Sequence, residues 1–388
     1  MSQIDDLLAD LCPDGAEFRE LREIFTIKGG YTPSKSDESA WTDGTVPWFR
    51  MEDLRANGGV LSDSLQHVHE SAIKGGLLFP ANSILIATSA TIGEHALITV
   101  PHLSNQRFTS LALRPGYSDC FDMKFVYYYC FVLADWCRSN TTTSSFASVD
   151  MGGLKRFRFP VLPLDVQREI VRVLDTFSEL EAELEAELKA RRRQYEHYRD
   201  SLLAFGEGEV EWVTLGDIAD VSWGDTSKTK RSYLTDHHGF IAYSATGPDG
   251  RLASYDYDRV GIVLSAIGAR CGKTWLASGR WSCIKNTIRF FSFREDRVTN
   301  EYLYWATSRP TIWRRNGSTQ PFITLSGARA TPVPLPSIAE QRSIVAILNA
   351  FDALVNDLSI GLPAELAARR KQYEYYRDKL LTFKELAG

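Results

Sequence analysis

A sixteen-residue block occurs twice in this chain, as ARRRQYEHYRDSLLAF at 190–205 and as ARRKQYEYYRDKLLTF at 368–383. Twelve of the sixteen positions are identical at a constant offset of 178, which is close to half of the 388 residues. A repeat with this period is typical of a chain built from two copies of one structural unit. The fold must therefore contain two similar units, and a protein of this kind suits a target that has two parts.

Each block ends a longer helical pattern. In the first copy, apolar residues recur at spacings of three, four or seven from Ile170 to Phe205, which places them on one helical face. Pro163 and Asp165 supply start signals and Gly206 supplies a stop. The pattern predicts a helix over 164–205, about 60 Å long at 1.5 Å per residue. A helix of this length needs a partner, and the natural partner is the helix of the other copy.

The second copy differs from the first in one respect. Gln167-Arg168 matches Gln341-Arg342 at an offset of 174, so the second copy has four more residues before its block. Four residues are about one helical turn, which keeps the apolar face aligned. Pro363 lies in this stretch and predicts a break or kink, because proline removes a helical hydrogen bond. The first copy instead carries a tandem Glu-Ala-Glu-Leu at 181–188.

The segments that precede the helices are diverged copies as well. Ile24 and Gly30 match Ile218 and Gly224 at an offset of 194, and SILIATSATIGE resembles GIVLSAIGARCGKT as a strand that ends in a glycine turn. These patterns predict a mixed α/β (α+β) chain with two globules and two long helices that pair with each other. The expected boundaries are an N-terminal helical segment at 1–14, globules at 15–160 and 207–333, and helical regions at 161–206 and 334–388.

Composition and charge restrict the function further. The chain is 44% hydrophobic and 24% charged, as is typical of a soluble globular protein, and no apolar run approaches the roughly 18–20 residues needed to cross a bilayer. Its acidic start lacks the plan of a signal peptide, which predicts a cytoplasmic protein. The net charge of −5 argues against an extended basic surface, but residues 206–333 contain 16 Lys and Arg against 13 Asp and Glu. Nucleic-acid binding is therefore possible only through local basic loops or with help from partner subunits.

Motifs for catalysis are missing from the sequence. GARCGKT at 268–274 resembles a phosphate-binding loop but has three residues, not four, between the first glycine and the Gly-Lys pair. The seven histidines form no convincing metal set, and the six cysteines form no CxxC pair and fit reduced buried thiols. The sequence predicts a chain with no catalytic residues and no bound metal.

Loops of the two globules contain the most suggestive side chains for DNA recognition. Loops 29–35 and 224–231 both combine glycine, hydroxyl groups and lysine, as contacts to a phosphate backbone require, and amides and arginines nearby suit base edges. Each residue taken alone is more simply explained as part of an ordinary surface loop. The candidate DNA contacts are Lys28, Tyr31, Thr32, Lys35, Arg50, Thr88, Ser89, Thr91, Asn105, Gln106, Arg107, Lys228, Lys230, Arg231, Arg270, Lys273, Asn286, Arg314 and Arg315.

The helical regions contain a second set of candidates, because their basic and tyrosine residues recur in both copies. A solvated helix face is the ordinary explanation for the arginines, and packing is the ordinary explanation for the tyrosines. Recurrence favours a shared role, such as docking the same partner twice, pairing the helices or touching phosphates. These candidates are Gln167, Arg168, Arg191, Arg192, Tyr195, Tyr198, Arg199, Gln341, Arg342, Arg369, Arg370, Tyr373, Tyr376 and Arg377.

Taken together, these features resemble the specificity subunit of Type I restriction–modification enzymes. The resemblance covers nearly the whole chain and rests on four landmarks. They are the entries PLDVQR at 163–168 and PSIAEQR at 336–342, the duplicated RRxQYxxYRDxLL block, the globule opening WVTLGDI at 212–218, and the Glu-Ala-Glu-Leu tandem, which is similar to the spacer repeats of some members.

The resemblance implies a non-catalytic subunit in which each globule is a target recognition domain for one half of a split double-stranded DNA site. It implies that the long helices pair antiparallel as a coiled coil and set the spacing of the half-sites. It also implies that the helical regions dock two modification (methyltransferase) subunits. Those subunits carry S-adenosylmethionine and methylate adenine at N6, and restriction subunits use ATP and Mg²⁺ to translocate and cleave. This chain would bind no cofactor itself and would work in the prokaryotic cytoplasm, away from membranes.

Two other functions remain open at this point. The first is a coiled-coil adaptor or scaffold whose globules bind proteins and not DNA. The second is a fused methyltransferase or nuclease, which would need a cofactor loop and a catalytic motif that the sequence does not contain. Assaying split-site adenine methylation with modification subunits separates these functions from DNA recognition.

Overall fold

The computed structural model describes residues 15–142, 147–206, 208–235, 238–356 and 361–385. The helical segment predicted at 1–14 lies outside the described residues. The chain divides into two compact units, which are described separately below. Unit 1 extends to Glu183 and resumes at Ala367, and unit 2 is Leu184–Leu366. Each unit therefore contains one globule together with parts of both helical regions.

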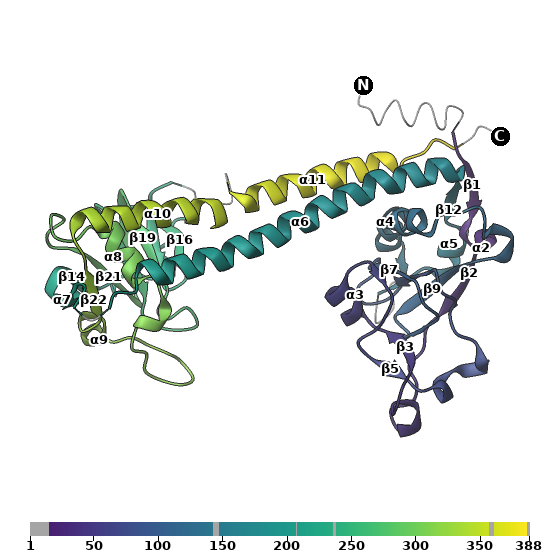
Figure 1. The fold of residues 1–388 in the computed structure, drawn as a ribbon, viewed down its shortest axis with the longest axis horizontal. Coiled ribbons are helices and arrows are strands. Elements are labelled where there is room, and N and C mark those ends of the chain that lie inside the picture. The colour runs from purple at the N-terminus through teal and green to yellow at the C-terminus, as the bar shows by residue number, and fades with distance from the viewer. Residues whose placement is uncertain (1–14, 143–146, 207, 236–237, 357–360, 386–388) are drawn as a thin grey trace. The chain divides into compact units, whose positions relative to one another are not determined.

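A five-stranded sheet forms the centre of unit 1 (Figure 1). Its strands, in spatial order, are β2 (Phe25–Gly29), β9 (Phe108–Leu113), β6 (Ser83–Ala87), β7 (His95–Ile98) and β4 (Val60–Leu61). The first four run antiparallel to their neighbours, and β4 is parallel to β7. Every residue of β6 is buried, which explains why this strand appears in the sequence as a continuous apolar run. The strand and turn predicted here are confirmed.

Smaller elements surround this sheet. A three-stranded sheet has the order β5 (His67–Val68), β3 (Val46–Phe49), β8 (Leu103–Ser104), and two pairs are β1 (Glu17–Glu20) with β12 (Arg158–Val161) and β10 (Thr141–Thr142) with β11 (Ser148–Val149). The α-helices of the globule are α2 (Leu21–Ile24), α3 (Met51–Asn57), α4 (Met123–Ser139) and α5 (Met151–Arg156). Short 3-10 helices are η1 (Glu38–Ala40), η2 (Glu70–Ala72), η3 (Lys74–Gly76) and η4 (Pro115–Tyr117).

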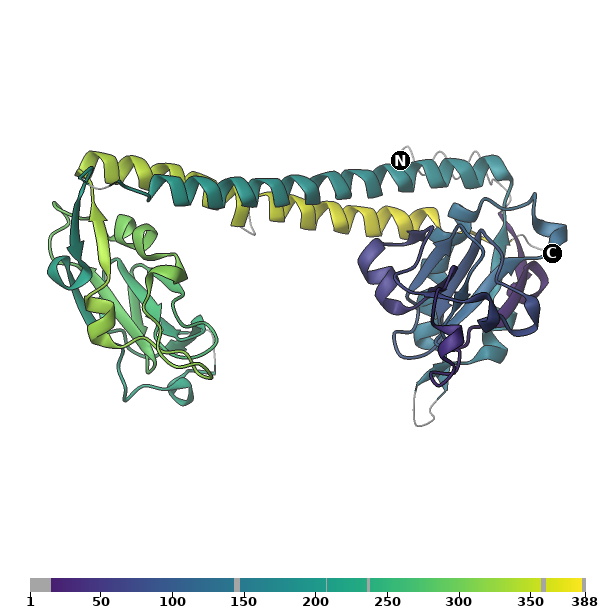
Figure 2. The same cartoon turned by 60° about the horizontal axis from the view of Figure 1, so that its bottom comes forward.

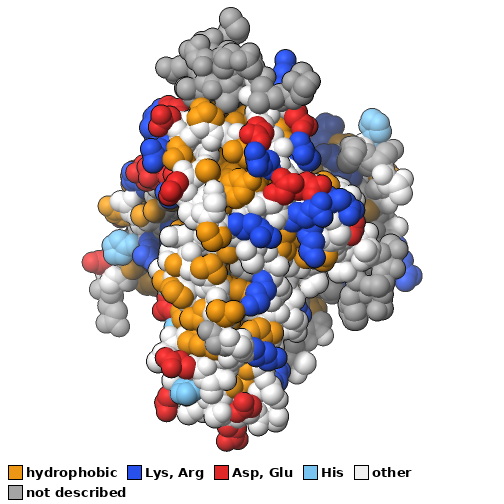
Figure 3. All heavy atoms as spheres, turned by 90° about the vertical axis from the view of Figure 1, so that its right-hand side faces the viewer, with side chains coloured by type: hydrophobic (Ala, Val, Ile, Leu, Met, Phe, Trp, Pro, Cys, Tyr) orange, Lys and Arg blue, Asp and Glu red, His pale blue; other side chains and the backbone are white. Residues whose placement is uncertain are grey.

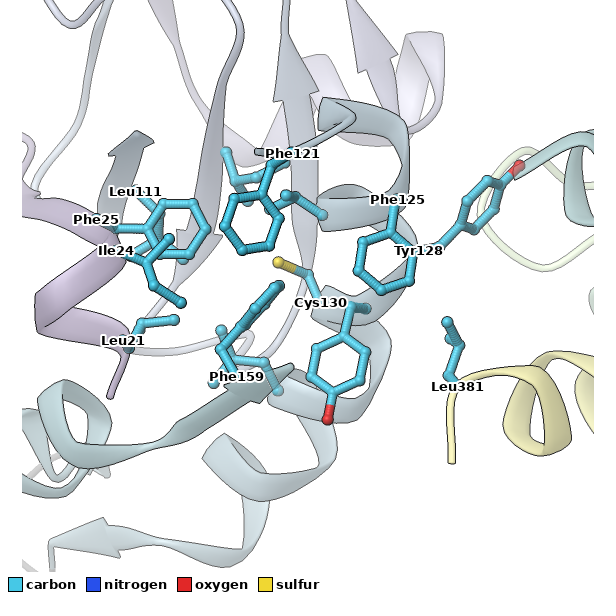
Figure 4. Packing of buried hydrophobic residues seen from close by; sticks show 14 of the residues in the cluster. Leu21, Ile24, Phe25, Leu111, Phe121, Phe125, Tyr128, Cys130, Phe159 and Leu381 are labelled. Atoms are coloured by element: carbon cyan, nitrogen blue, oxygen red, sulfur yellow. The ribbon is translucent and has the colours of Figure 1, made fainter. Parts of the chain in front are cut away.

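The main core of unit 1 lies between the sheet and α4. Aromatic rings dominate it: Phe25 packs edge-on against Phe159 at 5.4 Å between centroids, and Phe125 is fully buried. Figure 4 shows these rings around Cys130, together with Leu381, which follows α11. Burial of several large rings supplies most of the driving force for folding this globule, at roughly 25 cal/mol per Å² of apolar surface.

Unit 2 repeats this plan. Its central sheet has the order β14 (Ala219–Trp223), β21 (Thr287–Ser292), β18 (Gly261–Ser265), β19 (Thr274–Ala277), in which every neighbouring pair is antiparallel. A second sheet has the order β16 (Gly247–Leu252), β15 (Phe240–Ser244), β20 (Arg280–Cys283), β17 (Tyr257–Asp258). Strand β15 is parallel to β20, as β3 is to β8 in unit 1. The two globules are therefore structural copies, as the offsets in the sequence predict.

The remaining elements of unit 2 also have counterparts in unit 1. The pair β13 (Glu211–Thr214) with β22 (Pro332–Leu335) corresponds to β1 with β12. The helices of the globule are α7 (Leu215–Ile218), α8 (Asn300–Thr307) and α9 (Leu325–Arg329), with 3-10 helices η5 (Lys230–Ser232) and η6 (Pro310–Ile312).

Three long helices complete the fold: α6 (Leu164–Leu202), α10 (Ile338–Asn356) and α11 (Leu362–Leu380). Helix α6 ends three residues before the predicted end at 205, because the chain after it turns into the core of unit 2, where Leu203 is buried. The break predicted at Pro363 is confirmed. Pro363 is the second residue of α11, a position at which a helix needs no hydrogen bond from the backbone nitrogen.

The long helices pair in antiparallel fashion inside each unit. In unit 1, Tyr376 of α11 stacks on Phe177 of α6 with 5.5 Å between centroids, and Arg370 lies 2.6 Å from Glu181. Residue numbers therefore rise along one helix as they fall along the other, and Figures 1 and 2 show the two helices side by side. In unit 2, Tyr198 of α6 stacks on Phe351 of α10 at 5.3 Å. The predicted fold class, two repeated globules with antiparallel paired helices, is confirmed.

Each repeated block completes the core of the globule formed by the other copy. Leu380 and Leu381, from the second block, belong to the core of unit 1, and Tyr195 and Leu203, from the first block, belong to that of unit 2. The Ala16 amide also donates to the Lys384 carbonyl at 2.8 Å. Among the described residues, no helix has an apolar stretch long enough to cross a membrane.

Candidate nucleic-acid interface

Three loops meet at one end of the central sheet of unit 1. One loop follows β2, another follows β6, and the third precedes β9, which lies between these two strands. Because β2 and β6 are both antiparallel to β9, their carboxyl ends lie beside its start. Backbone hydrogen bonds join the loops: the Tyr31 amide donates to Ser104 at 2.8 Å, and the Thr88 amide donates to Arg107 at 2.9 Å. The structure thus brings together loops that the sequence separates by up to about 75 residues.

The same connections occur in unit 2. The Asp225 amide donates to Cys283 at 2.9 Å, and the Ala266 amide donates to Asn286 at 3.1 Å. Asn286 has a φ of 72°, a left-handed conformation that asparagine tolerates better than most residues. The two units therefore hold their loops with one set of backbone bonds, while the side chains on the loops differ.

Gly30 and Gly224 explain why the first loop needs a glycine in both copies. A Cβ on Gly30 would lie 2.2 Å from the Asn105 carbonyl oxygen, and a Cβ on Gly224 would lie 2.4 Å from the Ile284 carbonyl oxygen. Only a residue without a side chain lets the two backbones approach this closely. The match of these glycines in the sequence thus marks the same structural crossing.

Two tryptophans fix the first loop of unit 1. The Trp48 indole N–H donates to the Tyr31 carbonyl at 3.0 Å, and the Trp41 indole N–H donates to the Ser34 carbonyl at 2.9 Å. The Tyr31 hydroxyl donates to Ala72 at 2.7 Å, so this predicted DNA contact also has a structural role. Neither tryptophan was predicted from the sequence, because neither belongs to a motif and the two indole N–H groups contact the loop only in the folded chain.

The other polar candidates of unit 1 lie around this loop. The Thr32 hydroxyl donates to the Gln106 side-chain carbonyl, and the Asn105 side chain accepts from the Arg107 amide at 3.0 Å. In the loop after β6, the Thr88 hydroxyl lies 3.1 Å from that of Thr109. Ser89 forms an isolated β-bridge with Ser148. Thr91 lies on the loop after β6, and the exposed Lys28 lies on strand β2.

Among the described residues, the cations of the predicted interface in unit 1 form no ion pair, whereas several other cations of this unit do. Arg19, Arg22, Arg55, Lys124, Arg138 and Arg158 each form an ion pair with a carboxylate. Within the described part of the chain, no ion pair is formed by Lys28, Lys35, Arg50 or Arg107. On the face of unit 1 drawn in Figure 3, basic side chains lie among acidic ones. The unpaired cations are therefore free to bind an external anion.

The corresponding loop of unit 2 is held by ion pairs. Lys228 Nζ lies 2.5 Å from Asp256, and Lys230 Nζ lies 2.5 Å from Asp249. Burial raises the pKa of Asp249, but hydrogen bonds from Lys230 and neighbouring hydroxyls outweigh it and lower the pKa to about 2. Both lysines were predicted as DNA contacts. The structure gives them a part in shaping the loop, since each already neutralises a carboxylate.

The remaining candidates of unit 2 fall into two groups. Arg270 donates to the Thr246 carbonyl at 2.5 Å, and Arg315 donates to that of Pro310 at 3.0 Å, so both stabilise neighbouring loops. Arg231, Lys273 and Arg314 are exposed, and no ion pair is recorded for them among the described residues. These three predicted contacts therefore remain available to an external anion.

Gln167 and Gln341 have a different role from the docking or helix pairing predicted for them. Both side chains are fully buried. The Gln167 amide donates to the Cys120 and Leu162 carbonyls at 2.8 Å and accepts from the Asp122 amide at 2.9 Å. Each glutamine joins the start of a long helix to its own globule, and a buried side chain of this kind is not available to a partner.

Tyrosines and arginines of the repeated block lie on the paired helices. Tyr195 is buried beside Trp305, and Tyr373 lies 6.3 Å from Phe177. Arg199 and Arg377 each donate to the aspartate that follows them and lie 5.8 Å from the ring of Tyr195 and Tyr373 respectively. The other arginines of the predicted set lie at partly or fully exposed positions on the helices: Arg168, Arg191, Arg192, Arg342, Arg369 and Arg370.

Comparison with known proteins agrees with this geometry. The family model described as "Type I restriction modification DNA specificity domain" matches residues 13–191 and 207–368. The EcoprrI specificity subunit of Escherichia coli is 43% identical over 362 residues, covering 88% of this chain and 89% of the relative. The EcoR124I/EcoR124II specificity subunit of the same organism is 33% identical and covers 67% of this chain and 71% of the relative.

Solved structures of low sequence identity share the fold. A chain from a study of complex assembly and conformational transition of the type I R-M system superposes with a TM-score of 0.65 at 15% identity, over 96% of this chain and 98% of the other. The HsdS subunit from Thermoanaerobacter tengcongensis gives a TM-score of 0.53 at 16% identity, over 95% and 97%. Together with the duplicated family match, these findings show that the chain belongs to the family of Type I restriction–modification specificity subunits.

Proposed function

We propose that this chain is the DNA sequence-recognition subunit of a Type I restriction–modification complex, in which each unit reads one half of a bipartite site. The observation that carries the proposal is the repeated three-loop end of the central sheet. One set of backbone bonds holds the loops in both units, and different side chains occupy them. A shared scaffold with diverged polar loops suits two readers of different sequences.

The loops have the chemistry that duplex DNA requires. Exposed cations such as Lys28 and Arg107 in unit 1, and Arg231 and Arg314 in unit 2, suit phosphates. Amides and guanidinium groups close to them suit base edges in the major groove. Two half-site contacts joined in one chain give a higher affinity than either alone when the spacing matches. Since the net charge is −5, partner subunits are expected to supply part of the positive surface around the DNA.

The partners follow from the family. Two modification subunits would dock on the helical regions, bring S-adenosylmethionine and methylate adenine at N6, and restriction subunits would add ATP-dependent cleavage. This chain would bind no cofactor, perform no catalysis itself and act in the prokaryotic cytoplasm. The adaptor function considered above is not favoured, because relatives that match most of this chain are restriction specificity subunits.

Methylation mapping tests the proposal. The chain is expressed with its modification subunit in a host without adenine methylation, and modified adenines are mapped across the genome. A single bipartite motif is expected, and methylation without a split motif, or none in a properly assembled complex, contradicts the proposal. Arg314→Ala should weaken the half-site read by unit 2 and leave that of unit 1 unchanged.

A further inference from the structure

A hollow of about 460 Å³ adjoins the first loop of unit 1. It opens beside β3, whose position next to β5 is visible in Figure 1. Its lining combines two cations, one carboxylate, an amide and two indole rings: Thr32, Lys35, Glu38, Trp41, Thr42, Trp48, Arg50 and Gln66. Both Thr32 and Lys35 belong to the loop that the two tryptophans fix, so the hollow forms part of the same end of the sheet.

Arg50 occupies a rigid position in this hollow. Its backbone amide donates to Asp53 Oδ2 at 2.6 Å, and Asp53 Oδ1 accepts from the Leu65 amide at 2.6 Å. Because Asp53 is fully buried and both its oxygens bind backbone amides, it fixes the start of α3. The Cα of Arg50 is therefore held by a buried carboxylate on one side and by the last strand residues of β3 on the other.

The Arg50 side chain lies against an aromatic ring but has hydrogen-bond donors without partners among the described residues. Its guanidinium lies 5.6 Å from the ring centroid of Trp48, a distance at which the aromatic ring attracts the cation. Arg50 Nε is buried and has no hydrogen-bond partner among the described residues. The rest of the guanidinium also forms no hydrogen bond or ion pair among the described residues, and Arg50 lines the open hollow. It is therefore available to a ligand that accepts hydrogen bonds.

The setting of Arg50 differs from that of the cations suited to phosphates. Lys28, Lys35 and Arg107 are exposed, whereas Arg50 is half-buried and stacked against a ring. A phosphate accepts paired hydrogen bonds from a guanidinium but can also be neutralised by an exposed, mobile cation, whereas reading a base edge requires a guanidinium held in one orientation. Guanine presents two acceptors, O6 and N7, at the spacing of the guanidinium fork. A guanine edge therefore fits the observed arrangement better than a phosphate does.

We propose that Arg50 reads a guanine at one fixed position of the half-site bound by unit 1, through paired hydrogen bonds to O6 and N7. Trp48 and Asp53 position the guanidinium. The inference rests on the proposed function, because it presupposes that unit 1 binds duplex DNA through this end of its sheet.

The test measures methylation rates of the complex with its modification subunit on synthetic duplexes. These duplexes carry the mapped site and every single base-pair change in the half-site of unit 1. Arg50→Lys keeps the charge but loses the fork, so preference for guanine at one position should fall about 5- to 100-fold. Preferences at the other positions and in the half-site of unit 2 should stay unchanged. Arg55→Lys is the matched control, because Arg55 lies in helix α3, which directly follows Arg50, but is exposed and paired with Glu94; it should keep every preference.

A second measurement uses the unaltered chain and does not depend on how a variant folds. Replacing the proposed guanine by 7-deazaguanine removes the N7 acceptor and should slow methylation about 10-fold, while the same replacement at other guanines has little effect. The Arg50→Lys complex should no longer distinguish the two bases.

Three results overturn the inference. The first is that the Arg50→Lys complex keeps all its base preferences. The second is that Arg50→Lys slows methylation equally on every duplex, as loss of a phosphate contact would. The third is that 7-deazaguanine has no effect on the unaltered complex at any position; each result would exclude a guanine contact. Absence of any bipartite methylation by the unaltered complex would instead refute the proposed function. The two failures are therefore distinguishable.

Discussion

At the residue scale, two buried glutamines show how the globules attach to the long helices. Gln167 and Gln341 make equivalent hydrogen bonds, and the Gln341 amide donates to Arg297 at 3.0 Å and to Pro336 at 2.9 Å. Each side chain satisfies backbone groups on both sides of the junction between globule and helix. The recurrence of a Gln-Arg pair in the sequence therefore reflects a structural joint, with the arginine on the outside.

Replacing Gln167 by leucine should destabilise unit 1, because the Cys120 and Leu162 carbonyls and the Asp122 amide lose their partner. Each unsatisfied buried group costs about 1–3 kcal/mol, so the free energy of unfolding should fall by about 3 kcal/mol in urea titrations. Arg168→Leu is the control, since Arg168 is exposed and makes only a 3.7 Å pair with Asp165. Equal decreases in the free energy of unfolding for the two variants would show that the glutamine does not hold the globule to the helix.

His102 should make unit 1 less stable in acid. It is fully buried between Phe49 and Phe79. Burial lowers its pKa to about 4, although a hydrogen bond with the Val100 carbonyl acts in the opposite direction. The unfolded chain therefore binds a proton that the folded chain excludes between about pH 6.5 and pH 4. The contribution of His102 to the free energy of unfolding is fully present above about pH 6.5. It falls by about 1.4 kcal/mol per pH unit as the pH drops from about 6.5 to about 4.

Urea titrations at several pH values measure this effect. His102→Leu should have a shallower dependence of the unfolding free energy on pH than the unaltered chain, by about the same 1.4 kcal/mol per unit. An unchanged slope in the His102 variant would mean that the histidine is protonated in the folded chain.

At the scale of elements, the long helices differ in continuity. Helix α6 is unbroken over 39 residues and contains the Glu-Ala-Glu-Leu tandem, whereas its counterpart is divided into α10 and α11. The number of residues in an unbroken helix fixes the distance between its ends, because every residue adds about 1.5 Å. We therefore expect α6 to set the spacing between the half-sites.

Deleting residues 185–188 tests this role. The deletion removes about 6 Å of helix and changes its phase by about 40°, so the spacer between the half-sites should shorten while both half-site sequences stay the same. Replacing the two glutamates of this segment by alanine keeps the length and should leave the spacer unchanged. A change in either half-site sequence after the deletion would contradict the separation of reading from spacing.

The stacked tyrosines should control how α11 docks in unit 1. Tyr376→Ala removes the stack on Phe177 and its buried area, so α11 should exchange its amide hydrogens faster, by roughly 10-fold for about 1.4 kcal/mol lost. Tyr375→Ala is the matched control, because Tyr375 is 62% exposed and should change exchange little. Equal protection in both variants would show that the stack does not hold the helix.

At the scale of the whole molecule, the repeat ties distant parts of the chain together. The second block completes the core of the first globule, and the first block completes that of the second. Each unit therefore buries side chains from a segment of the opposite half of the sequence. This arrangement explains why the blocks stayed nearly identical while the globules diverged: the blocks face equivalent, shared surfaces.

Truncating the chain after Leu366 should destabilise unit 1, although unit 1 lies mostly at the other end of the sequence. The truncation removes Leu380, Leu381 and Phe383, which pack against the first core, and hydrogen exchange should increase in α4 before it does so in α8. The double variant Leu380→Ala/Leu381→Ala should act in the same direction in the full-length chain. Loss of protection confined to unit 2 would contradict this description.

Local patterns predicted much of the fold and part of the candidate site. The buried run of β6, the helix from Leu164 and the break at Pro363 were all visible in the sequence, because each depends on periodicity or on one residue's backbone chemistry. The matching glycines Gly30 and Gly224 also marked one structural crossing, since only glycine fits it.

Contacts between distant segments decided the rest. No local signal shows that Lys228 meets Asp256, that Trp41 and Trp48 clamp the first loop, or that each repeated block packs on the other copy's globule. These outcomes depend on which side chains share a surface after folding, and periodicity along the chain carries no information about that. The duplicated sequence thus specified two units with paired helices, and only the tertiary structure decided how the halves complete each other and which cations remain free for DNA.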